Sequence, residues 1–90
     1  MHVPRYIIER TVGSITQEQL EQSARRSLAA IAELDGVVWI KSYVSYAEGK
    51  VYCEYDAPDE EAVREHARRA GLPVDKISQV ALEISPEMFR

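Results

Sequence analysis

The sequence has only one cysteine and no long apolar run. Because Cys53 has no second cysteine to pair with, a disulfide within the chain is excluded. The apolar runs fall far short of the roughly 20 residues that a membrane-spanning helix needs. The first residues also lack the charged and apolar pattern of a secretory signal. These absences lead us to expect a cytoplasmic protein with no membrane partner.

An excess of basic residues is missing as well. The chain has 11 Lys and Arg against 15 Asp and Glu, interspersed along the sequence, for a net charge of −4. A nucleic-acid partner would favour a basic face that neutralises phosphates, so we expect none. The sequence also has no CxxC, HExxH, glycine-rich phosphate loop or Ser-His-Asp order, so no catalytic signature indicates an enzyme.

What is present is an alternation of strand and helix signals over residues 1–90, the length of a single domain. Thr16 and Gln19 have the spacing of a capping box at the start of a helix. Pro58 suits the first position of a second helix, and Glu48-Gly49 suits a two-residue turn between strands. Together these patterns predict strands at 3–11, 37–46, 50–55 and 77–84, and helices at 16–34 and 58–70.

This β-α-β-β-α-β order is typical of the α+β ferredoxin-like sandwich. Right-handed crossovers place both helices on one face of a four-stranded antiparallel sheet. The other face then has no cover from within the chain. We therefore expect a homodimer, in an assembly of the dimeric α+β barrel type.

The two-residue turn also predicts which side chains share a face of the sheet. The helix-covered face would carry Val38, Ile40, Ser42, Val44, Val51, Cys53, Tyr55, Val80, Leu82 and Ile84. The open face would carry Trp39, Lys41, Tyr43, Tyr52, Glu54, Gln79, Ala81 and Glu83. In the first strand, either Glu9 or Arg10 must face the helices.

The predicted open face is aromatic and polar together. Trp39, Tyr43 and Tyr52 would form a patch too apolar for the free surface of a monomer, which favours a dimer interface there. The same rings also predict a cleft for a small molecule between two such faces. Glu54 would be its polar handle, joined by Glu9 and Glu83.

A second candidate site lies on the other side of the sheet. His66 belongs to one helical stripe that faces the sheet, made of Ala62, Val63, His66, Ala67 and Ala70. Cys53 is expected on the same side, so the thiol and the imidazole can approach one another. In contact they would form a nucleophile pair or a transition-metal site. The alternative, which the spacing favours, is a hydrogen-bonded core histidine beside a cysteine that packs as a small hydrophobe.

Several stretches are specific when taken together: Ile8-Glu9-Arg10-Thr11, Val38-Trp39-Ile40-Lys41-Ser42-Tyr43-Val44, Val51-Tyr52-Cys53-Glu54-Tyr55, Ala57-Pro58-Asp59-Glu60-Glu61-Ala62-Val63-Arg64-Glu65-His66-Ala67 and Gly71-Leu72-Pro73. They span nearly the whole chain, and they resemble a family of small bacterial proteins, formerly of unknown function, with a nickel-binding branch. The resemblance implies a ferredoxin-like homodimer that binds Ni²⁺ at its surface for sequestration. It implies no established enzyme activity.

We take His66, Cys53 and Glu9 as candidate nickel ligands, because nickel accepts imidazole, thiolate and carboxylate donors. The chain has only two histidines, so an all-histidine site within a monomer is excluded. A dimer can pool ligands from two copies.

Three functions remain open at this stage. The first is a small metal-binding protein for nickel. The second is a small-molecule binding protein or enzyme of the dimeric α+β barrel type. In that case Trp39, Tyr43 and Tyr52 would stack on an aromatic or polyketide-like ligand, and Glu54 or Glu9 would act as a base. The third is a purely structural or regulatory dimer.

Overall fold

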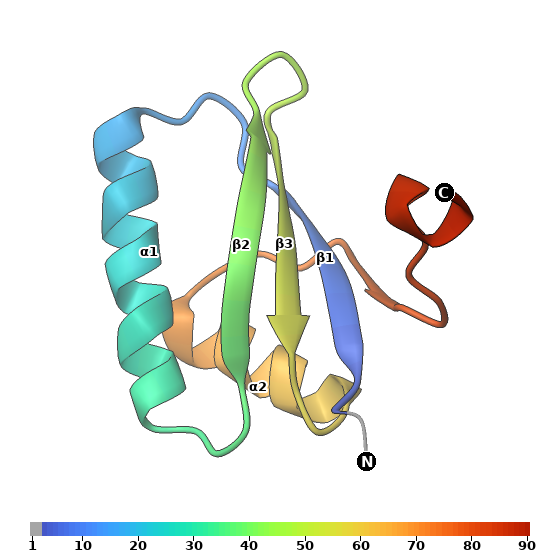
Figure 1. The fold of residues 1–90 in the computed structure, drawn as a ribbon. Helices are drawn as coiled ribbons and strands as arrows, with labels where there is room; N and C mark the ends of the chain where they lie inside the picture. Colours follow the sequence, from blue (N-terminus) through green and yellow to red (C-terminus); the bar gives the residue numbers. More distant parts are fainter. Residues whose placement is uncertain (1–2) are drawn as a thin grey trace.

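The structure, a computed structural model, describes residues 3–90. Four strands and two helices follow one another in the expected order (Figure 1). They are β1 (Arg5–Thr11), α1 (Gln17–Ala32), β2 (Val38–Ser45), β3 (Lys50–Asp56), α2 (Glu60–Ala70) and β4 (Lys76–Gln79), with a 3-10 turn, η1 (Pro86–Phe89), at the end. No helix in this part of the chain is long and apolar enough to cross a membrane.

The strands form one antiparallel sheet in the order β2-β3-β1-β4. Both helices lie on one face of this sheet, α2 behind the strands and α1 beside β2, and the opposite face is open (Figure 1). The predicted ferredoxin-like α+β fold is therefore confirmed.

The β2–β3 connection is longer than predicted. Residues 46–49 form a four-residue loop, so the predicted two-residue turn at Glu48-Gly49 was wrong. Gly49 has a φ of +66°, and its carbonyl accepts hydrogen bonds from the Val12 and Gly13 N–H groups at 2.8 and 3.0 Å. A Cβ at Gly49 would lie 3.1 Å from the Gly13 Cα, so glycine suits both the conformation and the contact.

Two extra loop residues shift the pairing by an even number, so the faces of residues 42–55 stay as predicted. Near the start of β2 they do not. A bulge between Trp39 and Lys41 inserts Ile40 as an extra residue, and this reverses the alternation before it. Trp39 therefore shares the helix-covered face with Tyr55, its partner across the strands. Val38 and Ile40 were predicted to be inside, yet they are 51% and 36% exposed.

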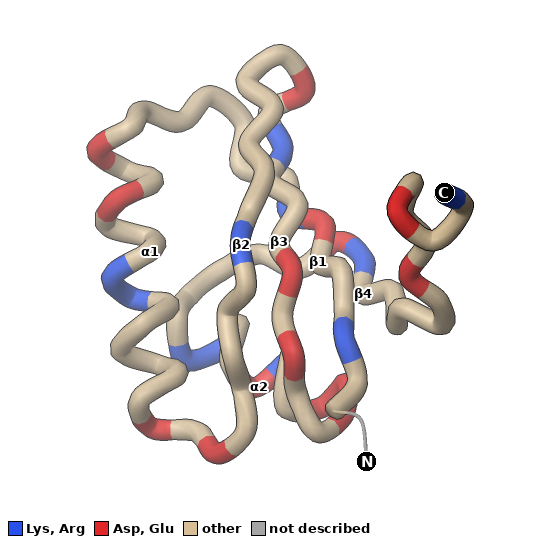
Figure 2. Tube along the Cα trace, viewed as in Figure 1, with Lys and Arg blue, Asp and Glu red and all other residues tan. Residues whose placement is uncertain are grey.

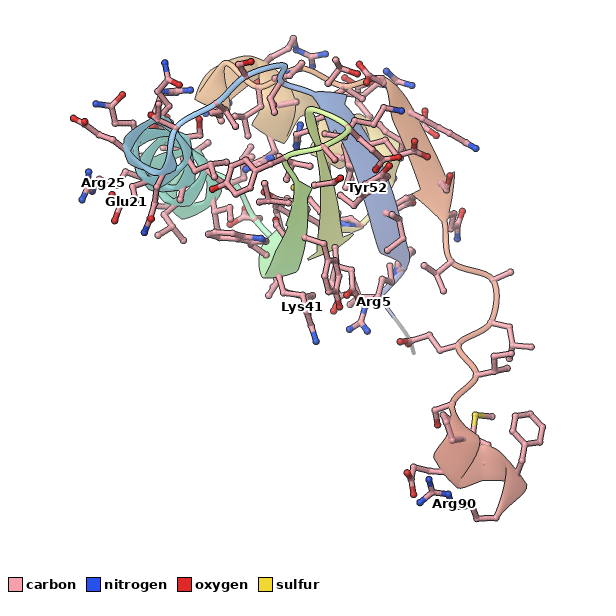
Figure 3. The ribbon with its side chains drawn as sticks, turned by 90° about the horizontal axis from the view of Figure 1, so that it is seen from above. Arg5, Glu21, Arg25, Lys41, Tyr52 and Arg90 are labelled. Carbon is pink, nitrogen blue, oxygen red and sulfur yellow. The ribbon has the colours of Figure 1, made fainter. Side chains whose placement is uncertain are left out.

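The last strand is shorter than the predicted 77–84. It pairs with β1 only from Lys76 to Gln79, because β1 begins at Arg5 and offers no partner beyond it. Leu82 and Ile84, expected in the core, are 75% and 67% exposed. Residues 80–90, which we call the C-terminal arm, leave the body on the side of the open face, the side toward which Arg5 and Lys41 point (Figure 3).

The helices begin and end at clear local signals. Thr16 and Gln19 form the predicted capping box of α1. At α2, the Asp59 side chain accepts a hydrogen bond from the Ala62 N–H, and Gly71 ends the helix with a φ of +68°. The core lies mainly between α2 and the sheet, and its buried apolar residues are Tyr6, Ile8, Val37, Val51, Cys53, Tyr55, Ala57 and Val63.

Candidate functional site

A cavity of about 340 Å³ separates the first half of α1 from strands β2 and β3. Its walls are mainly apolar, and they come from two sides of the layered fold. Its lining includes Arg10, Ala24, Trp39, Ser42, Cys53 and Tyr55. A volume of this size lies within the range of small-molecule pockets.

One wall carries a short chain of hydrogen bonds. The Trp39 Nε1–H donates to Ser42 Oγ at 3.0 Å, and the Ser42 hydroxyl donates to Cys53 Sγ at 3.0 Å. The bulge before Lys41 makes this possible, because it turns the indole toward the helices. Cys53 lines the cavity but is only 5% exposed, so its thiol is not a solvent-exposed nucleophile.

Arg10 is the buried cation of this wall. It shares the alternation of Tyr6 and Ile8 on β1, which settles the open choice between Glu9 and Arg10 in favour of Arg10. Its Nη1 donates to the Pro73 carbonyl at 2.7 Å, while its Nε and Nη2 are buried without a hydrogen-bond partner. The Tyr55 ring lies 5.9 Å from the guanidinium carbon, within the distance of a cation–π contact.

His66 lies deeper, against the sheet as predicted. Its Nε2 is 3.0 Å from Ser27 Oγ, which is in turn 3.0 Å from the Tyr55 hydroxyl. Its ring also packs on Tyr55, with ring centroids 4.8 Å apart. Burial, aided by the charge of Arg10, lowers the pKa of His66, so the ring is neutral near pH 7. Burial likewise raises the pKa of Tyr55 and keeps its hydroxyl protonated.

The three candidate metal ligands are not brought together. His66 and Cys53 lie on the helix-covered side, where each has its own serine partner, Ser27 and Ser42. Glu9 pairs with Tyr52 across the strands, on the open face, and its carboxylate is 3.9 Å from Lys50 Nζ. Within residues 3–90, no group of three or more histidine, cysteine, aspartate or glutamate side chains is placed to hold a metal ion. His2 lies outside the described residues. One chain therefore offers no complete nickel site in the part described.

Of the four residues predicted to hold a ligand on the open face, three lie there. Tyr43 and Tyr52 are cross-strand partners, and the Tyr43 hydroxyl donates to Glu54 Oε1 at 3.5 Å. Trp39, the fourth, lies on the other face of the sheet, in the cavity.

Basic residues of β1 and acidic residues of β3 lie on neighbouring strands (Figure 2). Arg5 Nε donates to Asp56 Oδ1 at 2.8 Å, and its Nη1 lies 3.1 Å from a Glu83 carboxylate oxygen and 3.9 Å from one of Glu54. In one chain the open face is therefore a mixed aromatic and ion-paired surface. The cleft expected between two such faces stays a prediction.

Comparison with known proteins assigns the chain to a family. The model of the SCO4226-like nickel responsive proteins matches residues 6–80. The chain belongs to this SCO4226-like family. A crystal structure of SCO4226 from Streptomyces coelicolor A3(2) superposes with a TM-score of 0.81 at 28% identity, covering 89% of this chain and 99% of that one.

A more distant structure, the structural-genomics protein YJCS, has a TM-score of 0.53 at 13% identity, with 89% of this chain and 99% of that chain covered. It supports the fold alone. No curated protein matches the chain. The nickel responsive name of the family agrees with the resemblance found in the sequence.

Sequence reasoning missed Arg10, Ser27 and Ser42 as members of the site. For Arg10 a signal was present, because Tyr6 and Ile8 precede it at every second position. Alternation had placed Ser42 on the helix-covered face, but for neither serine did the sequence reveal its partner across the fold, which is Tyr55 for Ser27 and Cys53 for Ser42.

Proposed function

We propose that this SCO4226-like protein is a cytoplasmic metal-binding protein that responds to nickel as a homodimer, with Ni²⁺ held by ligands from two copies. The observation that carries the proposal is the match of residues 6–80 to a family named for its response to nickel. Within residues 3–90 of one chain no group of three suitable ligands is placed together, and in this proposal a second copy supplies the remaining ligands.

The open face supports the dimer. It exposes Tyr43 by 55% and Val38 by 51%, which are large apolar surfaces for a monomer. The C-terminal arm extends on the same side and exposes four further apolar residues, Leu82, Ile84, Met88 and Phe89. A second copy placed on the open face would therefore meet both the sheet and the arm.

The open face also carries the carboxylates that such a site needs. Glu9 and Glu54 lie on β1 and β3, and each is within 3.9 Å of a basic side chain, Lys50 and Arg5 respectively. Carboxylates and imidazoles are accepted by nickel in octahedral or tetragonal sites. Since His66 is fully buried, its ring is a support of the core in this proposal, and the nickel ligands lie on the open face.

The test combines sedimentation with a nickel titration by calorimetry on protein without a histidine tag. We expect a dimer that binds Ni²⁺ in a fixed ratio to chains. Tyr43→Glu should give monomers, because it places a charge in the interface, and it should weaken nickel binding. Leu28→Glu, a similar change at an exposed residue of α1, is the matched control and should leave both unchanged. Nickel binding by a monomeric Tyr43→Glu variant would show that one chain is sufficient, and no heat with the wild type would end the proposal.

A further inference from the structure

The cavity under α1 is unexplained by a nickel response. It lies on the face of the sheet opposite the proposed dimer interface, and Ni²⁺ has no use for its apolar walls. It is nonetheless a built feature. The single tryptophan and the single cysteine of the chain both line it, joined through Ser42.

One residue of the cavity lining, Arg10, is a buried charge without an ion-pair partner among the described residues. Arg10 is 2% exposed, yet no carboxylate among residues 3–90 forms an ion pair with it, and its Nε and Nη2 are unpartnered. A buried charge that lacks a counter-ion is costly, and the Pro73 carbonyl supplies only one acceptor. The Tyr55 ring adds a cation–π contact at 5.9 Å, but it brings no negative charge.

We propose that the cavity binds a small organic carboxylate, with its apolar body between α1 and the sheet and its carboxylate toward Arg10. A guanidinium favours a carboxylate because the planar N–H groups match its two oxygens. The volume of about 340 Å³ suits a single compact ligand, and the mainly apolar walls suit a hydrocarbon or aromatic body. The one acid of the lining, Glu21, is exposed on α1, so it does not neutralise Arg10 (Figure 3).

The chain contains its own reporters for this ligand. Trp39 is the only tryptophan, so a change in protein tryptophan fluorescence reports directly on the cavity. Cys53 is the only cysteine, so its rate of alkylation reports on access to the same space. The two measurements are independent of nickel and are made on protein treated with a chelator.

The probes are octanoate and its neutral counterpart 1-octanol. Octanoate should change Trp39 fluorescence saturably and slow Cys53 alkylation, with an affinity about tenfold higher than that of octanol. Arg10→Met should abolish this preference for the anion and leave the two probes with similar affinities. Equal affinities in the wild type would show an apolar cavity without anion selection and would overturn the proposal, as would the absence of any response.

A second pair of variants keeps the test decisive if Arg10→Met fails to fold. Ala24 lines the cavity on α1, whereas Ala29 of the same helix is exposed away from it. Ala24→Leu should fill the space and reduce octanoate binding at least tenfold, whereas Ala29→Leu should bind as the wild type does. Unchanged octanoate binding by Ala24→Leu would place the ligand elsewhere and overturn the proposal.

Discussion

The two helices cover the same face of the sheet in different ways. α2 buries Val63, His66, Ala67 and Ala70 among its 11 residues. α1 is longer, with 16 residues, yet it buries only Ser27 and Ala30. The part of α1 that would otherwise complete the core faces the cavity instead.

This difference teaches where the molecule is fixed and where it can adapt. Close-packed side chains tolerate neither lost nor added volume, whereas a cavity leaves room for either a ligand or a larger side chain. The α2 half thus anchors the fold, and the α1 half is the side available for recognition. Substitutions matched between the two helices test this division.

The largest effect is expected at the α2 anchor. His66→Ala removes a fully buried ring and leaves the Ser27 hydroxyl with one partner fewer, so the free energy of unfolding should fall by about 3 kcal/mol. On α1, Leu28 is 54% exposed, and Leu28→Ala should cost less than about 0.5 kcal/mol. Urea unfolding of both variants gives the comparison. Equal losses would show that the two helices are packed alike.

Added volume should have opposite consequences on the two helices. Ala67 is 4% exposed on α2, so Ala67→Leu should lower the free energy of unfolding by about 1–3 kcal/mol through overpacking. Ala24→Leu adds the same three carbon atoms, but it places them in the cavity under α1 and should be neutral or stabilising. Thermal unfolding distinguishes them, and a loss at Ala24 as large as at Ala67 would mean that the cavity has no room for the side chain.

The pH dependence of stability should also depend on α2, through His66. Because the pKa of His66 is lowered in the folded state, the unfolded chain binds more protons below about pH 6.5. The free energy of unfolding should therefore fall as the pH falls from about 6.5 toward the lowered pKa, by about 1.4 kcal/mol per unit of pKa difference. Urea titrations at several pH values measure this slope. His66→Gln, which does not titrate, should flatten it, and an unchanged slope would assign the effect to other groups.

The contrast between the helices also shows what the sequence could reveal. The order of elements, the start of α1 and the inward direction of His66 follow from local periodicity and capping, and each was predicted from residues close together in the chain. The start of α2 was predicted at Pro58, whereas the helix begins at Glu60 with Asp59 as its N-cap. The burial of Arg10 could also have been predicted, since alternation with Ile8 places it on the helix-covered face.

The remaining features depend on contacts between distant segments. The bulge at Ile40 turned Trp39 inward, although neither glycine nor proline marks that position. The last residue of β4 depends on the first residue of β1, its pairing partner. The volume of the cavity depends on the distance between α1 and the sheet. A pattern in a single segment carries no information on such distances, so the cavity between α1 and the sheet was not predicted.

The smallest effect concerns the helix starts, where α1 and α2 are alike. Thr16 and Asp59 each accept a hydrogen bond from a backbone N–H of the first turn, and loss of such a cap costs about 1 kcal/mol. Thr16→Ala and Asp59→Ala should therefore lower the free energy of unfolding by similar amounts.

Amide hydrogen exchange should nevertheless distinguish the two variants. The first turn of α1 lies over the cavity with little buried contact, so Thr16→Ala should speed exchange locally, ahead of global unfolding. At α2 the buried Val63 holds the start of the helix to the sheet, and Asp59→Ala should speed exchange only as far as the global stability falls. Thr16→Ser keeps the hydroxyl and should restore protection in α1. Equal local opening of both helices would show that the cavity under α1 does not make α1 more mobile than α2.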